Sequence, residues 1–166
     1  MARIAILTAS DKGAAGERAD TSGDTIARRI AEAGHELAWR EIVADDRPIL
    51  AARLAAWADE AIADIILTTG GTGLTPRDVT PEATRDIAER DVPAIPVALA
   101  VAGLQKTPFA ALSRGIAVTR GKTLIVNLPG SPKAVDEGMD VLLPLFPHIV
   151  DLLAGPLEYE PGATGR

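Results

Sequence analysis

The segment that most constrains the fold of this chain is a glycine-rich stretch from Thr68 to Thr84, which reads TTGGTGLTPRDVTPEAT. Apolar residues lead into it at Ile62 and Ile65–Leu67, and a helical pattern follows it. This order predicts a buried strand that runs into a glycine-rich turn and then a helix. The turn glycines can adopt positive φ, and successive N–H groups in such a turn can converge on an anion such as phosphate. These glycines are Gly70, Gly71 and Gly73.

The turn is neither of the two common nucleotide-binding motifs. No Gly-Lys-Ser/Thr follows it, as in a P-loop, and its glycines are not spaced as in a dinucleotide fingerprint. A tight turn without a ligand is the alternative to a phosphate site. Asp78, at the rim of the turn, favours a phosphate site, because its carboxylate can orient a metal ion or the substrate. Its other interpretation is a pairing with Arg77 or the helix dipole, worth only about 0.3–1 kcal/mol.

Strand and helix patterns alternate along the chain. Thr80 is expected to cap one helix, Asp46 is a candidate cap of another, and Pro144 and Pro147 are expected to break the last one. The alternation predicts an α/β three-layer sandwich, with a mostly parallel central sheet, an antiparallel edge hairpin and helices on both faces. Strands are expected at 4–9, 37–43, 64–69, 116–119 and 123–127, and helices at 23–33, 48–60, 81–89, 94–105 and 132–153.

Four loops of this predicted fold leave strands at their carboxyl ends. Ligands of open α/β sheets bind at that edge, so these loops are expected to meet there and form one site. They contain nearly all the polar residues with chemical potential. The loops are Ser10–Ser22, Ala44–Arg47, Gly70–Thr80 and Leu128–Lys133.

Composition narrows the class of protein. A length of 166 residues predicts a single domain, expected at 1–155, followed by a loosely ordered Gly- and Pro-rich tail at 156–166. The net charge of −6 and the lack of a basic run argue against a nucleic-acid partner. Without cysteine there is no disulfide, thiolate nucleophile or thiolate metal site. No apolar segment approaches about 20 residues, so no membrane span is expected and the predicted location is cytoplasmic.

Carboxylates in two of these loops are the candidate metal ligands. Asp45 and Asp46 follow the second predicted strand. One would cap the next helix and the other would bind a ligand, and the residue pattern leaves open which does which. Mg²⁺ usually takes one or two protein carboxylates and completes its sphere with phosphate oxygens and water. Asp45 and Asp78, on neighbouring loops, fit that requirement.

Two further loop segments have alternative interpretations. Arg114, next to Ser113, is either a solvated surface charge or a bidentate phosphate ligand. The run from Asn127 to Lys133 is either a rigid turn with Ser131 as an N-cap or a helix N-terminus that binds an anion. His35 and His148 lie outside the four loops and are interpreted as surface or structural residues.

These segments together resemble the molybdopterin adenylyltransferase family of molybdenum cofactor biosynthesis, which includes the gephyrin-type G domains. The block GGTG…RDVTPEA joined to LPGSP carries most of the resemblance, which extends over nearly the whole chain. It implies a homotrimeric α/β enzyme that binds molybdopterin and uses Mg²⁺ and ATP to transfer AMP to the terminal phosphate. It also implies handover of the product to a molybdenum insertase. A non-catalytic molybdopterin-binding relative or a scaffold of the pathway is the alternative.

The resemblance also assigns roles to residues of this chain. Asp45 and Asp78 are implied to be the catalytic and Mg²⁺-binding aspartates. The implied contacts of the pterin phosphate are Thr69, Gly70, Gly71, Thr72, Gly73, Thr80, Ser113 and Arg114. The implied nucleotide contacts are Ser10, Asp11, Asn127, Pro129, Gly130 and Ser131.

Overall fold

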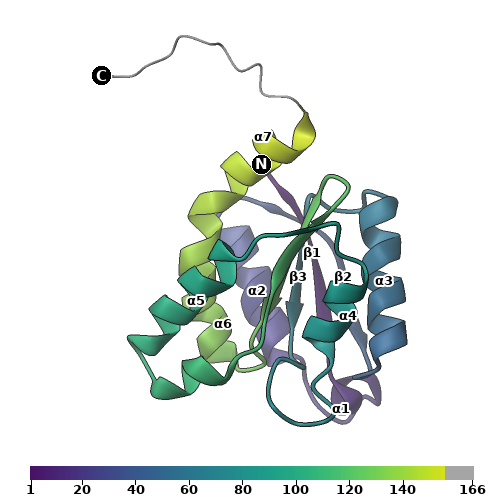
Figure 1. The fold of residues 1–166 in the computed structure, drawn as a ribbon, viewed down its shortest axis with the longest axis vertical. Helices are drawn as coiled ribbons and strands as arrows, with labels where there is room; N and C mark the ends of the chain where they lie inside the picture. Colours follow the sequence, from purple (N-terminus) through teal and green to yellow (C-terminus); the bar gives the residue numbers. More distant parts are fainter. Residues whose placement is uncertain (156–166) are drawn as a thin grey trace.

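A computed structural model describes residues 1–155 of the 166-residue chain. A six-stranded sheet lies between two layers of helices (Figure 1), with the strand order β2-β1-β3-β6-β5-β4. The predicted α/β class is confirmed. The single domain at 1–155 stays a prediction, and the predicted tail at 156–166 lies outside the described residues. Within residues 1–155, no helix is long and apolar enough to cross a bilayer.

The sheet is parallel except at one edge. β2, β1, β3 and β6 run parallel, whereas β5 is antiparallel to β6 and β4 is antiparallel to β5. The predicted edge hairpin is therefore confirmed. The two-residue strand β4 was not predicted, since it is too short to show a period. The strands are β1 (Arg3–Ala9), β2 (Glu36–Val43), β3 (Ile65–Thr69), β4 (Arg90–Asp91), β5 (Ala117–Arg120) and β6 (Thr123–Leu128).

The helices follow the predicted pattern with a few differences. Pro144 and Pro147 divide the last predicted helix, as expected. A short helix and a 3₁₀ turn occupy segments that were predicted as loops. The helices are α1 (Asp11–Ala14), α2 (Thr21–Glu32), α3 (Arg47–Asp59), α4 (Thr80–Asp86), α5 (Ala94–Leu104), α6 (Pro132–Leu142) and α7 (Phe146–Ala154), with 3₁₀ turns η1 (Pro108–Leu112) and η2 (Leu143–Leu145).

The prediction that Thr80 caps α4 is wrong. Val79 is the N-cap residue, and no side chain bonds the first turn of the helix. Thr80 is instead the first helical residue, and its Oγ1 donates a hydrogen bond to the carbonyl oxygen of Gly70 at 3.0 Å. The hydroxyl therefore supports the glycine-rich turn rather than the helix end. The helix also ends at Asp86, three residues earlier than predicted.

Each face of the sheet has its own hydrophobic core. Alternate residues of the central strands point to opposite faces, so Ile4 and Ile6 pack on the side of α2, α5, α6 and α7, and Ala5 and Leu7 pack on the side of α3 and α4. Burial on both faces explains why these strands are continuously apolar. The chain reaches this packing with few aromatic side chains, chiefly Phe146 on one face and Trp57 on the other.

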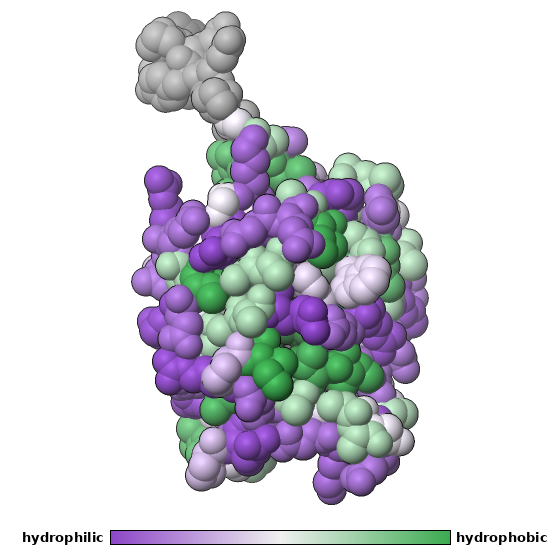
Figure 2. All heavy atoms as spheres, turned by 90° about the vertical axis from the view of Figure 1, so that its right-hand side faces the viewer, coloured by the Kyte–Doolittle hydropathy of each residue, from purple (hydrophilic) through white to green (hydrophobic). Residues whose placement is uncertain are grey.

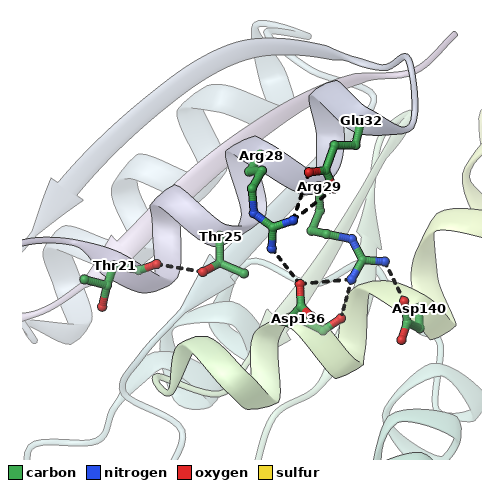
Figure 3. A network of polar contacts seen from close by, with 7 residues as sticks. All are labelled: Thr21, Thr25, Arg28, Arg29, Glu32, Asp136 and Asp140. Atoms are coloured by element: carbon green, nitrogen blue, oxygen red, sulfur yellow. Dashed lines mark hydrogen bonds and ion pairs between the residues drawn. The ribbon is translucent and has the colours of Figure 1, made fainter.

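Ion pairs join α2 to α6 on the first of these faces (Figure 3). Arg29 donates to the carbonyl oxygen and the carboxylate of Asp136 at 3.0 Å and also pairs with Asp140. Arg28 pairs with Asp136 at 2.9 Å and with Glu32 one turn along its own helix. The amino end of each helix lies at the carboxyl edge of the sheet because α2 follows β1 and α6 follows β6, and the ion pairs join the two helices where they lie side by side.

The opposite side of the molecule, where α3 lies, presents hydrophilic and hydrophobic residues intermixed (Figure 2). β2 forms the sheet edge, where the exposed side chains of Leu37 and Trp39 are interspersed with Arg40 and Glu41. Charged side chains on an edge strand oppose pairing with another chain.

Candidate active site

The four predicted loops meet at the carboxyl edge of the parallel strands, beside α1 (Figure 1). The backbone N–H of Asp11 bonds the carboxylate of Asp45 and the N–H of Asp45 bonds that of Asp11, both at 3.0 Å. Arg77, from the glycine-rich loop, forms a two-pronged ion pair with Asp11. Thr69 Oγ1 donates to the Pro129 carbonyl at 2.6 Å. These contacts confirm the predicted convergence of the loops.

Two cavities open at this edge and share part of their walls. The larger has a volume of about 650 Å³ and extends along the apolar helix α5. The smaller, of about 230 Å³, is polar and is bounded by the loop that leads into α2. Gly71, Asp78 and Gly130 line both cavities. Two ligands that occupied the two cavities would therefore meet at the glycine-rich turn.

Most of the predicted site residues line one of these cavities. The larger contains, besides the shared residues, Thr72, Gly73, Ser113, Asn127, Pro129 and Ser131, and the smaller contains Ser10, Asp45, Thr69 and Gly70. Residues implied to bind the pterin phosphate and residues implied to bind the nucleotide thus lie together in the larger cavity. Asp11, Thr80 and Arg114 line neither of the two.

The glycine-rich turn needs glycine for steric as well as conformational reasons. Gly70 and Gly71 have φ values of 87° and 64°. A Cβ atom on Gly70 would lie 2.4 Å from the carbonyl oxygen of Ala9, and one on Gly71 would lie 2.2 Å from Thr80 Oγ1. The turn therefore packs tightly against β1 and α4, and this packing holds its backbone at the boundary of the two cavities.

Asp45, rather than Asp46, is available to bind a ligand. The Asp46 carboxylate accepts a hydrogen bond from the N–H of Ile49 at 3.0 Å and so caps α3, as predicted. Asp45 lines the smaller cavity, and its Oδ1 lies 3.1 Å from the position that a Cβ on Gly71 would take. Burial raises the pKa of Asp45, and the negative charges of the Asp11 and Asp78 side chains raise it further. The hydrogen bond from the backbone N–H of Asp11 lowers the pKa, but by less than these effects raise it.

Asp78 is held by its own loop and lies where the cavities meet. Its Oδ2 accepts hydrogen bonds from the N–H and the Oγ1 of Thr75, at 2.8 and 2.7 Å. Burial acts to raise the pKa of Asp78, but these bonds, a bond from Gly73 and the charge of Arg114 together lower it. The environment of Asp78 therefore favours its ionised form.

The charges of the smaller cavity fit a cation together with an anionic substrate. Asp20, Asp45 and Asp78 line it, and Arg18 is the only basic side chain among the described residues lining either cavity. A polyphosphate there would be repelled unless a cation accompanied it. Within residues 1–155, no three His, Cys, Asp or Glu side chains form a metal site by themselves. Two carboxylates beside the glycine-rich turn fit Mg²⁺, which takes its remaining ligands from phosphate and water.

Two predicted ligand contacts are bonded instead to the protein. The buried amide of Asn127 donates from Nδ2 to Thr68 and Thr84, each at 2.9 Å, and accepts from the N–H of Ile116. Arg114 donates to backbone carbonyl groups and to Glu82. These side chains support the site, and the interpretation of Arg114 as a bidentate phosphate ligand has no support in this geometry.

The sequence analysis missed the residues that hold the amino end of α2 at the smaller cavity. Asp20, which is 4% exposed, caps α2 through Gly23 at 2.9 Å and accepts from Thr8 and from Arg40 at 2.8 and 2.7 Å. A Cβ on Gly23 would lie 2.1 Å from Asp20 Oδ2, so only glycine fits there. Aspartate is a preferred N-cap residue, so Asp20 before the helical segment is a signal that could have located the start of α2.

Replacing Asp20 by Asn is expected to lower the free energy of unfolding at pH 7 by about 2–3 kcal/mol, because it removes one partner of a buried, hydrogen-bonded ion pair. Burial opposes ionisation of Asp20, but the bonds from Arg40, Gly23 and Thr8 outweigh it and lower its pKa. Its stabilisation is therefore present above the ordinary aspartate pKa and is lost as the pH falls through the lowered value. Urea denaturation at pH 7 and pH 3 measures both effects.

The matched control is Asp24→Asn. Asp24 also pairs with Arg40 at 2.7 Å, but its side chain is 67% exposed. The Asp24→Asn substitution should therefore lower the free energy of unfolding by less than about 1 kcal/mol. Equal losses for the two variants would contradict the role assigned to Asp20.

The fold and site define an α/β protein with a glycine-rich turn between two cavities at the carboxyl edge of its sheet. The sequence matches the family described as a probable molybdopterin binding domain over residues 5–148. The chain belongs to this family, which confirms the resemblance seen in the sequence.

The chain covers most of the length of some relatives and only a part of others. It is 39% identical to the molybdopterin adenylyltransferase of Helicobacter pylori strain J99 over 154 residues, which make up 92% of this chain and 88% of that protein. It is 42% identical to the Drosophila melanogaster molybdenum cofactor synthesis protein cinnamon over 149 residues, 89% of this chain but only 25% of that protein. The crystal structure of the molybdopterin biosynthesis enzyme MoaB from Thermus thermophilus superposes with a TM-score of 0.87 and 50% identity, covering 94% of this chain and 98% of that one.

Proposed function

We propose that this chain is a molybdopterin adenylyltransferase, which transfers AMP from ATP to the terminal phosphate of molybdopterin and releases pyrophosphate. The relative from Helicobacter pylori that is named for this activity aligns over most of its own length with this chain. The structural observation that carries the proposal is the pair of cavities that share Gly71 and Asp78. This geometry suits a reaction in which two phosphate-bearing substrates must bring their phosphates together.

The reaction requires no covalent intermediate with the protein. An oxygen of the molybdopterin phosphate forms a bond to the α-phosphorus of ATP, and the bond from that phosphorus to the bridging oxygen of the β-phosphate breaks. Pyrophosphate leaves with the electron pair. The attacking phosphate oxygen is already anionic at neutral pH, so the protein need not remove a proton. The lack of cysteine and of a histidine at the site is therefore compatible with the chemistry.

The protein would act by positioning and by charge stabilisation. The backbone N–H groups of the turn at Gly70–Gly73 would hold the attacking phosphate, and Gly130, whose Cβ position lies 3.4 Å from the Cα of Gly70, keeps the opposite loop close. Asp45 and Asp78 would hold Mg²⁺, which supplies positive charge to the triphosphate and to the departing pyrophosphate. The turn and the two carboxylates are fixed by bonds within the protein before any substrate binds.

The remaining parts of the proposal rest on the family resemblance. They are a homotrimeric assembly, a cytoplasmic location and handover of the adenylylated product to a molybdenum insertase. Sedimentation equilibrium of the purified protein measures the assembly directly. A mass of one or two chains at micromolar concentration would contradict a trimer.

Incubation of the protein with molybdopterin, ATP and Mg²⁺ tests the proposed activity, with mass spectrometry of the released pterin. The expected product is adenylylated molybdopterin with an equal amount of pyrophosphate, and neither should form when Mg²⁺ is withheld. Binding of molybdopterin without turnover would instead identify a non-catalytic relative. Failure to bind molybdopterin would contradict the proposal altogether.

A further inference from the structure

The guanidinium group of Arg114 bridges the two ends of the loop that follows the glycine-rich turn. Its Nε donates to the carbonyl oxygen of Gly73 at 2.7 Å, and its Nη2 donates to the carbonyl oxygen of Asp78 at 2.6 Å. The backbone N–H of Arg114 also donates to the carbonyl oxygen of Thr72 at 2.9 Å. One residue thereby fixes the spacing between the turn and Asp78.

A carboxylate behind the guanidinium fixes its orientation. Nη1 of Arg114 bonds Oε1 of Glu82, which lies in the first turn of α4, and Nη2 approaches Oε2 at 3.5 Å. The Arg114 side chain is about one-third exposed. Because Glu82 belongs to α4, the contact also ties the loop to a helix packed on the sheet. The neighbouring residue, Ser113, lines the larger cavity, so Arg114 also fixes the start of that segment.

The loop has few other restraints. Within Gly73–Asp78, Thr75 bonds the Asp78 carboxylate, and the N–H of Asp78 bonds the carbonyl oxygen of Thr75. These bonds are internal and move with the loop. Leu74 is 65% exposed, so no buried side chain there anchors the segment. Arg77 holds the loop to Asp11, but through exposed side chains, whose ion pairs are weak.

We propose that Arg114 is a positioning residue for adenylyl transfer, which touches no substrate and acts by holding Asp78 at a fixed place relative to the amides of the turn. The inference rests on the proposed function. The planar guanidinium reaches these two carbonyl oxygens and the carboxylate from three separate nitrogens. Lysine keeps the charge but presents its three donors from a single nitrogen, so it cannot reproduce this geometry.

The Arg114→Lys variant tests the proposal, with Arg120→Lys as its matched control. Arg120 has the same chemistry: it pairs with both oxygens of Asp59 at 2.8 Å and donates to the Ile87 carbonyl at 3.2 Å. Its side chain is 27% exposed, against 34% for Arg114. Arg120 pairs with Thr123 at the amino end of β6. The site lies at the carboxyl ends of the parallel strands, so Arg120 is at the other end of the sheet.

Arg114→Lys is expected to lower kcat about 10–100-fold, the size seen when partners that orient catalytic ligands are removed. The Mg²⁺ concentration for half-maximal rate should rise by a similar factor, while KM for ATP changes less than about threefold. Hydrogen exchange of the amides at 73–79 should accelerate at least tenfold, with other protected amides unchanged. Arg120→Lys should leave kcat, Mg²⁺ dependence and exchange at 73–79 within about twofold of the original protein.

A kcat for Arg114→Lys within twofold of the original protein would overturn the proposal. A loss of activity without faster exchange at 73–79 would also overturn it, because it would indicate that Arg114 acts on a substrate directly. An equal loss in Arg120→Lys would overturn it as well, because it would indicate general destabilisation. If the unaltered protein transfers no AMP, the proposed function fails by itself, and exchange then decides the role of Arg114. Faster exchange confined to 73–79 supports positioning of the loop, and unchanged exchange overturns it.

Discussion

Asp78→Asn is expected to reduce the rate of adenylyl transfer by about 10²–10³-fold, the size found when one group that stabilises developing charge in a transition state is removed. Among residues 1–155, Asp78 is the one carboxylate that lines both cavities. Asparagine has nearly the same shape and can still accept a hydrogen bond from Thr75, so the loop should keep its conformation. The variant loses the negative charge that would hold Mg²⁺ between the two substrates.

Two measurements on the Asp78→Asn variant, with one control variant, separate a role in transfer from a role in binding. The kcat for adenylyl transfer should fall as stated, while the Kd for molybdopterin, measured by fluorescence or calorimetry, should change less than about threefold. Asp46→Asn is the control, because Asp46 lies at the same edge but caps α3, and asparagine is an equally good N-cap. Full turnover in Asp78→Asn, or an equal loss in Asp46→Asn, would contradict the role of Asp78.

Asp45→Asn is expected to lower the rate of adenylyl transfer about as much as Asp78→Asn does, but the two variants should change the free energy of unfolding in opposite directions. Burial and two neighbouring negative charges raise the pKa of Asp45, so its ionised form is disfavoured in the folded protein. Replacing it by a neutral isostere removes that penalty at pH 7, and the free energy of unfolding should stay equal or increase. The pKa of Asp78 is lowered, so Asp78→Asn should instead lose stability at pH 7, by about 1 kcal/mol, the usual net contribution of one hydrogen bond.

The pH dependence of unfolding provides the check on this pair of variants. A carboxyl group with a raised pKa destabilises the fold above that pKa, and the penalty vanishes as the pH falls through it to the ordinary aspartate value near 4. The advantage of Asp45→Asn should therefore shrink between pH 7 and pH 4 in urea denaturation. An Asp45→Asn protein that keeps its activity, or is less stable by more than about 1 kcal/mol at pH 7, would contradict the assignment.

The periodic and local features of this chain could be predicted from its sequence. Continuous apolar runs identified the buried strands, and Pro48, two residues after Asp46, identified the start and cap of α3, because these signals depend only on nearby residues. The meeting of the four loops followed from the parallel order of the strands. Prediction was weaker where a residue's partner lies far away along the chain.

Arg114, Thr80 and Asp20 show why the remaining details could not be predicted. An arginine beside a phosphate site suggests a phosphate ligand, but two backbone carbonyl groups of another loop accept its bonds. A threonine before proline suggests a cap, but the Gly70 carbonyl 10 residues earlier takes its hydroxyl. Asp20 depends on Arg40, which lies on β2 after the intervening helix. Only the three-dimensional packing decides between these partners.

A crystal structure of Asp78→Asn with molybdopterin, ATP and Mg²⁺ tests the central claim most directly, since the slow variant should retain both substrates. The account predicts the terminal phosphate of molybdopterin on the amides of Gly71–Gly73, with one of its oxygens about 3–3.5 Å from the α-phosphorus of ATP. The two substrates should occupy different cavities and meet beside residue 78. A pterin phosphate bound away from the turn, or both substrates in one cavity, would contradict the account.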